Sequence, residues 1–198
     1  MIHFIKMITF LILAGFSLIA QANCTISNAM AVNPVGPLTY KGQADGAVIG
    51  SQIGSGWGGS VTQPTVFGNC GGATKQNAYV KPRDIPTGVI YSNAGINYPI
   101  YPTGVNGIGY VIGIKDPYAS AYISISPPQV QTFPTAGVSN DPRSSIGYTA
   151  QVLYVITGTL KTGTYVVPSK IIADLTITNA ITGAMFASPT TLTLGGDY

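Results

Sequence analysis

Hydrophobic and polar positions alternate along most of the chain with a period of two, which is typical of β-strands. Ile108, Tyr110 and Ile112, for example, share one face of a short run whose other face carries glycines and a valine. The strands predicted in this way cover residues 47–53, 61–67, 78–81, 89–92, 108–114, 119–126, 148–156 and 171–178.

Glycine- and proline-rich segments separate these runs and predict turns and loops. Residues 54–60 form a glycine-rich, flexible loop with the only tryptophan, Trp57, and residues 159–163 form a turn that leads into a short strand at 164–167. After the first 22 residues, no window has a convincing helical period. Many short strands with frequent turns predict an all-β domain, an immunoglobulin-like or jelly-roll β-sandwich.

The N-terminal segment has the pattern of an export signal. A positively charged start is followed by an apolar run over residues 7–19 and by the small-x-small sequence Ala20-Gln21-Ala22. The run is short for a membrane span, which needs about 20 apolar residues. We therefore expect residues 1–22 to be a cleaved signal peptide with Asn23 as the first mature residue, an uncleaved membrane anchor being the alternative.

The two cysteines, Cys24 and Cys70, both follow the predicted cleavage site. An even number of cysteines in an exported chain indicates a disulfide, because the compartment is oxidising. A metal site would need more ligands than two thiols, and a redox pair is more often spaced C-x-x-C. We expect one structural disulfide, which the chain-entropy model values at about 4 kcal/mol.

The composition excludes several functions. Only 8% of the 198 residues are charged, all six acidic residues are aspartates, and the only histidine, His3, lies in the predicted signal. A mature chain without histidine and glutamate lacks the commonest general acids and bases and the commonest zinc ligands. The net charge of +3 is spread over scattered basic residues, so nucleic acid is not an expected partner. We expect no enzyme activity, no metal and no cofactor.

Tyrosine is abundant, with twelve in the chain, and several lie in predicted loops. An aromatic ring with a polar tip suits a half-hydrated surface, where it can pack against the C–H face of a sugar. Tyrosine is also a good strand residue, which is the plainer explanation for any single one. Trp57 is equally well explained as a ligand platform or as a residue that fills a gap in the core. The tyrosines in predicted loops are Tyr91, Tyr98, Tyr101 and Tyr118.

Taken together, these segments resemble the receptor-binding (lectin) domain of fimbrial tip adhesins that Gram-negative bacteria assemble by the chaperone–usher route. Cys24 just after the signal, with Cys70 some forty residues later, is similar to the cysteine placement in these adhesins. Residues 106–114 look like their glycine-rich hydrophobic strand, and residues 146–163 look like their late strand pair. The resemblance covers most of the mature chain and implies a β-sandwich that binds a glycan.

Within that group, the F17-type lectin domain is the most similar. Gly109 to Asp116 matches its hydrophobic strand followed by an aspartate, and in that domain the aspartate contacts N-acetylglucosamine. The match departs from the family at Pro117, where a threonine is usual, in the placement of the disulfide, and in a ligand tryptophan that has no identified counterpart. The carbohydrate-binding residues implied here are Asp116, Tyr118, Asn140, Asp141, Arg143, Ser144 and Ser145.

The resemblance also implies partners and a location. The expected ligand is a host glycan ending in N-acetylglucosamine, galactose or a related sugar. The expected protein partners are a periplasmic chaperone, an usher and other fimbrial subunits, at a fimbrial tip on the cell surface. We expect a lectin-like domain over residues 23–180, with a final strand or the start of a linker over 181–198. A single-domain pilin assembled by donor-strand exchange is the alternative.

Overall fold

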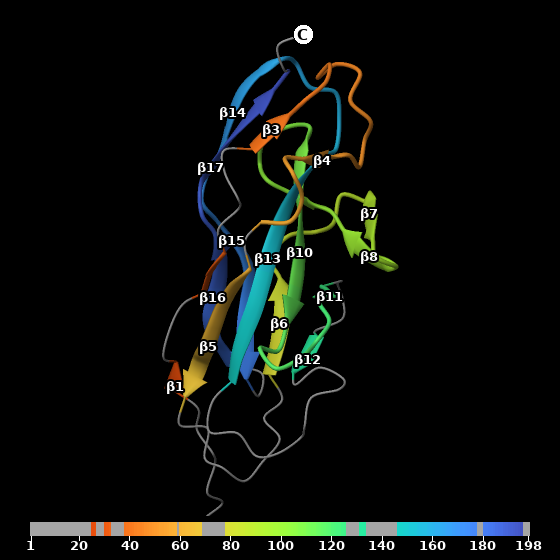
Figure 1. Ribbon diagram of the computed structural model, residues 1–198. Coiled ribbons are helices and arrows are strands. Elements are labelled where there is room, and N and C mark those ends of the chain that lie inside the picture. The colour runs from red at the N-terminus through yellow and green to blue at the C-terminus, as the bar shows by residue number, and fades with distance from the viewer. Residues whose placement is uncertain are drawn as a thin grey trace, which may run out of the picture.

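The fold is built from β-strands arranged in two main layers and extended along one axis (Figure 1). No helix long and apolar enough to cross a membrane occurs among the residues that the structure describes. The computed structural model describes residues 25–26, 30–32, 38–58, 60–68, 78–125, 131–133, 146–177 and 180–195.

The first layer is an antiparallel sheet centred on the neighbouring strands β10 (Ile108–Lys115) and β13 (Ile146–Ile156). Two further short strands pair with this centre near its upper end in Figure 1. The remaining members are β1 (Thr25–Ile26) and β5 (Val61–Gly68) beyond β13, β11 (Ile123–Ser124) beyond β10, β4 (Gln52–Ile53) on β13 and β9 (Tyr101–Pro102) on β10.

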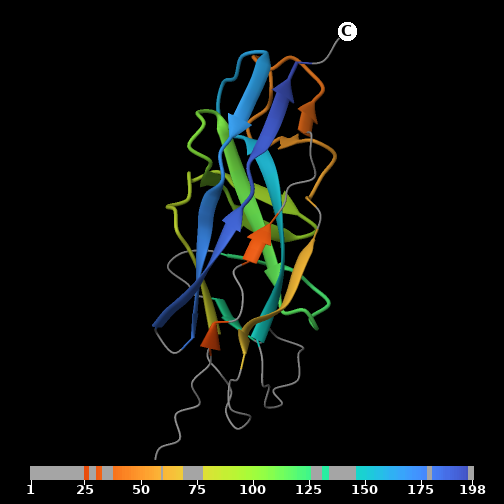
Figure 2. The ribbon, with the colours of Figure 1, turned by 90° about the vertical axis from the view of Figure 1, so that its left-hand side faces the viewer.

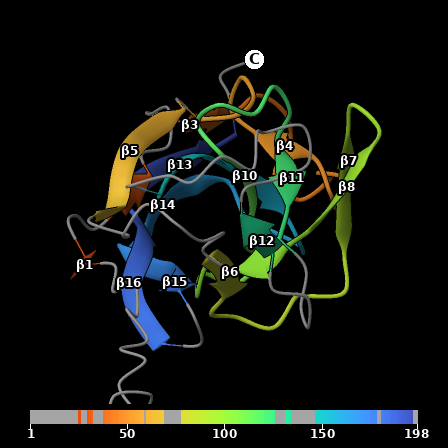
Figure 3. The same ribbon diagram turned by 90° about the horizontal axis from the view of Figure 1, so that it is seen from below.

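The second layer faces the first, as the view along the molecule shows (Figure 3). It contains, in order, β12 (Gln131–Phe133), β6 (Ala78–Pro82), β15 (Lys170–Ile177), β16 (Ala180–Ala187) and β2 (Met30–Val32). A three-stranded sheet consists of β14 (Gly163–Val167), β17 (Thr190–Leu194) and β3 (Leu38–Tyr40).

Early and late parts of the chain pair with each other in parallel. Strand β2 pairs with β16, and β3 pairs with β17, which Figure 2 shows as orange strands beside blue ones. The stretch from residue 181 onwards, for which the sequence left a final strand or a linker open, thus contains most of β16 and all of β17. Met185, Leu192 and Leu194 of these strands are buried in the main core.

Strands β10 and β13 are buried on both faces. Their inward side chains, including Ile112 and Val152, form the main core between the layers. Their outward side chains, including Val111 and Leu153, form a smaller cluster covered by the hairpin of β7 (Ile90–Asn93) and β8 (Ile96–Pro99). Burial on both faces explains why these two strands read as continuous apolar runs rather than as strict alternation.

Most predicted strands are confirmed. The segments predicted at 61–67, 78–81, 89–92, 108–114, 148–156, 164–167 and 171–178 correspond to β5, β6, β7, β10, β13, β14 and β15. The turn predicted at 159–163 does lead into β14, but β14 pairs with β17 rather than with β13.

Two predicted strands are wrong over most of their length. Of the described residues 119–125, only Ile123–Ser124 form a strand, because the chain turns directly after β10 and the N–H of Ala119 donates to the carbonyl of Asp116 at 2.9 Å. Only Gln52–Ile53 of 47–53 is a strand, because Gly50 has a φ of +89° and the preceding residues form turns. Apolar alternation in both segments reflects loop residues, such as the 69% exposed Val48, rather than a pleated face.

Several predictions lie outside the described residues. These are the signal peptide over residues 1–22, the Cys24–Cys70 disulfide, and the loop residues Asn140, Asp141, Arg143, Ser144 and Ser145.

Candidate functional site

Asp116, the aspartate that the sequence singled out, directly follows β10 at the lower end of that strand. Its side chain is only 1% exposed, and its Oδ1 accepts a hydrogen bond from the backbone N–H of Tyr118 at 3.0 Å. This contact holds the Asp116-Pro117 turn in the way that aspartate commonly does. Tyr118 is 79% exposed and therefore presents its ring to the solvent. The structure brings these two residues together, with one inside the fold and the other outside.

Tyr148 of β13 is fully buried near this turn. Burial raises the pKa of its phenol well above the usual value, and the negative charge of Asp116 raises it further. The neutral phenol is therefore the form present at physiological pH. The carboxylate of Asp116 and the phenol of Tyr148 make this end of the β10–β13 pair a closed, polar corner of the core.

Trp57 packs against the tyrosines of the β7–β8 hairpin. Its ring lies edge-on to Tyr98 with centroids 5.0 Å apart, and edge-on to Tyr91 at 6.2 Å. Tyr98 is buried, whereas Trp57 and Tyr91 are half-buried. Trp57 thus packs on the outer cluster and keeps part of its surface accessible. The hydroxyl of Tyr91 donates to Oε1 of Gln52 at 3.2 Å, which connects this aromatic group to strand β4.

A cavity of about 560 Å³ opens beside Gln52, between β3 and β4 near the upper end of the molecule. This volume lies within the range of small-molecule sites, which is roughly 300–1,000 Å³. Gly54 contributes to its wall at a φ of +91°, and a Cβ there would approach Cδ2 of Leu38 to 2.8 Å. The lining residues are Leu38, Thr39, Tyr40, Lys41, Gln52, Gly54 and Ser55.

The polar groups on the cavity wall are available for a ligand. Within the part of the chain that the structure describes, the Tyr40 hydroxyl, the Lys41 ammonium and the amide nitrogen of Gln52 make no hydrogen bond. Sequence reasoning missed these residues because none belongs to a motif. The only hint was the neighbouring glycine-rich loop that carries Trp57.

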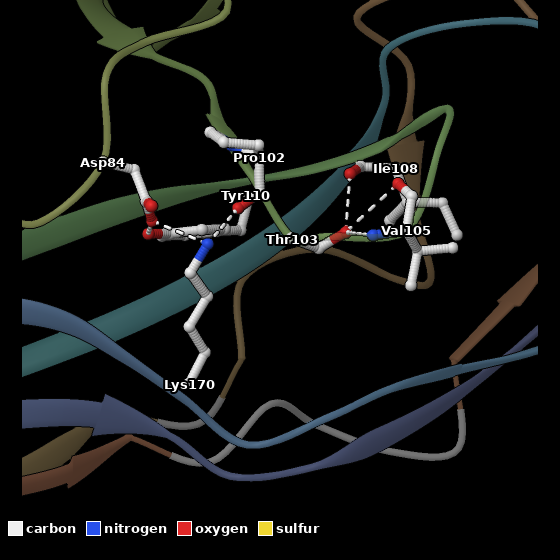
Figure 4. Close-up of polar contacts among 7 residues, drawn as sticks. All are labelled: Asp84, Pro102, Thr103, Val105, Ile108, Tyr110 and Lys170. Atoms are coloured by element: carbon white, nitrogen blue, oxygen red, sulfur yellow. Dashed lines mark hydrogen bonds and ion pairs between the residues drawn. The ribbon is translucent and has the colours of Figure 1, made fainter.

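A second polar cluster connects the two layers (Figure 4). Oδ2 of Asp84 accepts a hydrogen bond from the hydroxyl of Tyr110 at 2.8 Å and forms an ion pair with Nζ of Lys170 at 2.9 Å. Nζ of Lys170 also donates to the carbonyl of Pro102 at 2.8 Å. Burial, followed by the contact with Asp84, raises the pKa of Tyr110 far above its ordinary value. All the groups in this cluster are engaged with one another, so we assign it a structural role.

Figure 4 also shows what fixes the turn before β10. The hydroxyl of Thr103, which is 2% exposed, donates to the carbonyl of Ile108 at 2.7 Å and accepts from the N–H of Val105 at 3.1 Å. These contacts set where β10 begins. Among the described residues, no group of three or more acidic, histidine or cysteine side chains could hold a metal ion.

Comparison with known proteins identifies the kind of domain. Neither a family model nor a curated protein sequence matches this chain. Among solved structures, the Proteus mirabilis ambient-temperature fimbriae adhesin AtfE matches with a TM-score of 0.72 and 26% identity, over 85% of this chain and 99% of that chain. The receptor-binding domain of a plasmid-borne adhesin of Klebsiella pneumoniae has the same fold, with a TM-score of 0.50 and 17% identity over 89% and 98%. The chain therefore matches fimbrial adhesin receptor-binding domains in structure, and the proteins it resembles are binding proteins rather than enzymes, as the sequence predicted.

Proposed function

We propose that this chain is the receptor-binding domain of a fimbrial tip adhesin, which binds host-cell glycans and attaches the bacterium to its host. The observation that carries the proposal is the match to the Proteus mirabilis fimbriae adhesin, which spans nearly all of that chain at 26% identity. The predicted signal peptide and disulfide fit a protein that passes through the periplasm. Assembly by a chaperone and an usher, and contact with other fimbrial subunits, belong to the same proposal.

The F17-type assignment of the sugar site is a finer part of this proposal. It places a sugar that ends in N-acetylglucosamine or galactose at Asp116, Tyr118 and the loop over residues 140–145. The exposed ring of Tyr118 supports a surface role for that residue, whereas Asp116 is 1% exposed and already bonds to the backbone. A sugar bound here would contact Tyr118 first and would reach Asp116 only if the turn rearranged.

A glycan array tests the function. The full chain, purified from the periplasm of an expression host, is expected to be a folded monomer that binds at least one terminal saccharide. A lectin domain should stay monomeric without a donor peptide, whereas a single-domain pilin should polymerise or aggregate until a donor strand is supplied. A folded monomer that binds no saccharide on the array would contradict the glycan-binding function.

A further inference from the structure

We propose that the cavity between β3 and β4 is a binding site for an acidic, N-acylated saccharide, of which sialic acid is the simplest representative. This inference rests on the proposed function, because it takes a host glycan as the receptor. It goes further in naming both a site and a class of sugar that the sequence did not indicate.

The side chains of the wall offer more hydrogen-bond donors than acceptors. The Lys41 ammonium offers three donors and no acceptor, and the amide nitrogen of Gln52 offers two more. The oxygen of the Gln52 amide already accepts one hydrogen bond, from the hydroxyl of Tyr91, which uses half of its accepting capacity. The hydroxyls of Tyr40, Thr39 and Ser55 can donate or accept, and no lining residue is an aspartate.

The hydrogen-bond donors of these side chains favour some sugars over others. A neutral sugar presents mainly hydroxyl groups, and binding it well requires acceptors for its hydroxyl hydrogens. A sugar with a carboxylate and an acetamido carbonyl presents several strong acceptors, which match the donors of Lys41 and Gln52. A hydrogen bond between an ammonium and a carboxylate is charge-assisted and is about twice as strong as one between neutral groups.

The surroundings of the cavity keep its donors in place. The hydrogen bond from Tyr91 fixes the amide of Gln52, so that its nitrogen is the end left to the ligand. The Tyr40 ring is supported by Gly42, where an added Cβ would come within 3.2 Å of the ring. Tyr91 and Trp57 continue from Gln52 as a half-buried aromatic surface, which suits the next sugar of a longer glycan. Tyr91 therefore acts as a positioning residue.

Titration with two matched ligands tests the proposal. Sialyllactose and lactose differ only in the acidic sugar, so each is titrated by calorimetry and by ligand-observed NMR against the full periplasmic chain. We expect sialyllactose to bind at least tenfold more tightly than lactose. We expect Lys41→Met and Gln52→Ala each to reduce the affinity for sialyllactose by about tenfold, the loss of one strong hydrogen bond. Equal binding of the two ligands would overturn the choice of sugar.

Matched variants separate a site effect from a general one. Lys81→Met removes an exposed lysine on β6, and Gln43→Ala removes an exposed glutamine that lies close to the cavity in sequence but does not line it. Both are expected to bind sialyllactose like the original chain. Tyr91→Phe is expected to reduce affinity less than Gln52→Ala, because it loosens the amide without removing it.

The possible failures are distinguishable. If Lys41→Met and Gln52→Ala bind sialyllactose as tightly as the original chain does, the cavity is not the site, and the inference is wrong. If a different glycan from the array binds and these variants do not affect it, the proposed function stands and the cavity inference falls. If no glycan binds to the folded chain, both fall together.

Discussion

The two ends of the β10–β13 strand pair differ in whether their polar groups already make hydrogen bonds. They lie roughly 20 Å apart, given about 3.3 Å per residue between Thr149 and Val155 on β13. At the lower end, Asp116 is buried and bonded to its own turn. At the upper end, the amide of Gln52 and the ammonium of Lys41 face a cavity, and the described contacts leave their donors unused.

This difference separates a polar group that holds the fold from one that can hold a ligand. A buried group that is already bonded contributes to stability, and its removal leaves its partner unsatisfied. An exposed donor on a cavity wall contributes little to stability but retains its capacity for binding. The lower end should therefore respond to mutation mainly in stability, and the upper end mainly in affinity.

Alkaline pH should give the largest effect, through the buried tyrosines at both ends. Burial raises the pKa of Tyr154, at the level of β4, to about 12, and that of Tyr148 also lies above its ordinary value. Because the folded pKa is the higher one, this contribution to stability is complete below pH 10 and is lost between pH 10 and about 12. Tyr154 alone accounts for roughly 3 kcal/mol. Urea unfolding at pH 9 to 12 measures the loss.

The matched variants for that experiment are Tyr154→Phe and Tyr118→Phe. The first should reduce the fall in the free energy of unfolding between pH 9 and 12, because it removes one of the buried titrating groups. The second is the control for the tyrosine-to-phenylalanine change itself, at a ring that is 79% exposed. An unchanged fall in Tyr154→Phe would contradict the assignment of the alkaline loss to this residue.

Asp116→Ala tests the lower end directly. It removes the acceptor of the Tyr118 N–H, in a part-buried hydrogen bond, so the free energy of unfolding should fall by about 1–3 kcal/mol. The melting temperature should fall by several degrees, and glycan affinity in the folded fraction should not change when the sugar binds at the β3–β4 cavity rather than at the F17-type site around Asp116. Asp45→Ala, at an exposed loop position, is the control. A tenfold loss of affinity in a variant that keeps its melting temperature would instead place the sugar at Asp116.

Tyr110→Phe should have a smaller effect, at about 1 kcal/mol. It removes one hydrogen bond to Asp84 but leaves the ion pair between Asp84 and Lys170 in place. Thermal unfolding measures the change, with Tyr79→Phe as the control, because the hydroxyl of the half-buried Tyr79 makes no hydrogen bond with the described residues. A destabilisation of the same size in both variants would show that the Asp84 contact contributes nothing.

The cavity variants should affect stability least. Gln52 is exposed, and Gln52→Ala loses only the contact with Tyr91, so its free energy of unfolding should stay within about 0.5 kcal/mol of the original. The same variant is expected to lose tenfold in sialyllactose affinity. Urea unfolding of the samples used for calorimetry compares the two quantities. A large loss of stability in Gln52→Ala would remove the contrast between the two ends.

The central strands were predictable because two faces of apolar residues leave a strong pattern. Strands β10 and β13 were found almost to the residue, since Ile108–Ile114 and Tyr148–Ile156 are buried on both sides. The errors lie where apolar residues occupy loops, as at Val48 and Ala121. There the glycine at position 50 and the turn at Asp116 set the backbone, against the local alternation of side chains.

The parallel pairs and the candidate cavity could not be predicted from local pattern. Whether β2 pairs with β16 depends on contacts between distant parts of the chain, which alternation does not encode. The cavity brings Tyr40 and Lys41 next to Gln52, which lies on another short strand. None of these residues belongs to a sequence motif. The motif recognised at Asp116 consists of the apolar strand that precedes this residue and the turn that follows it. The buried strand β10 and the hydrogen bond from the Tyr118 N–H to Asp116 account for both parts.

Under the proposed attachment function, the cluster of Asp84, Tyr110 and Lys170 would have a mechanical consequence. It ties strand β10 of one layer to strand β15 of the other through contacts that cross the interface between the layers. If the layers slid past each other under tension, these contacts would have to break together rather than one after another. A force that pulls along the strands would therefore meet a shear resistance concentrated at this point.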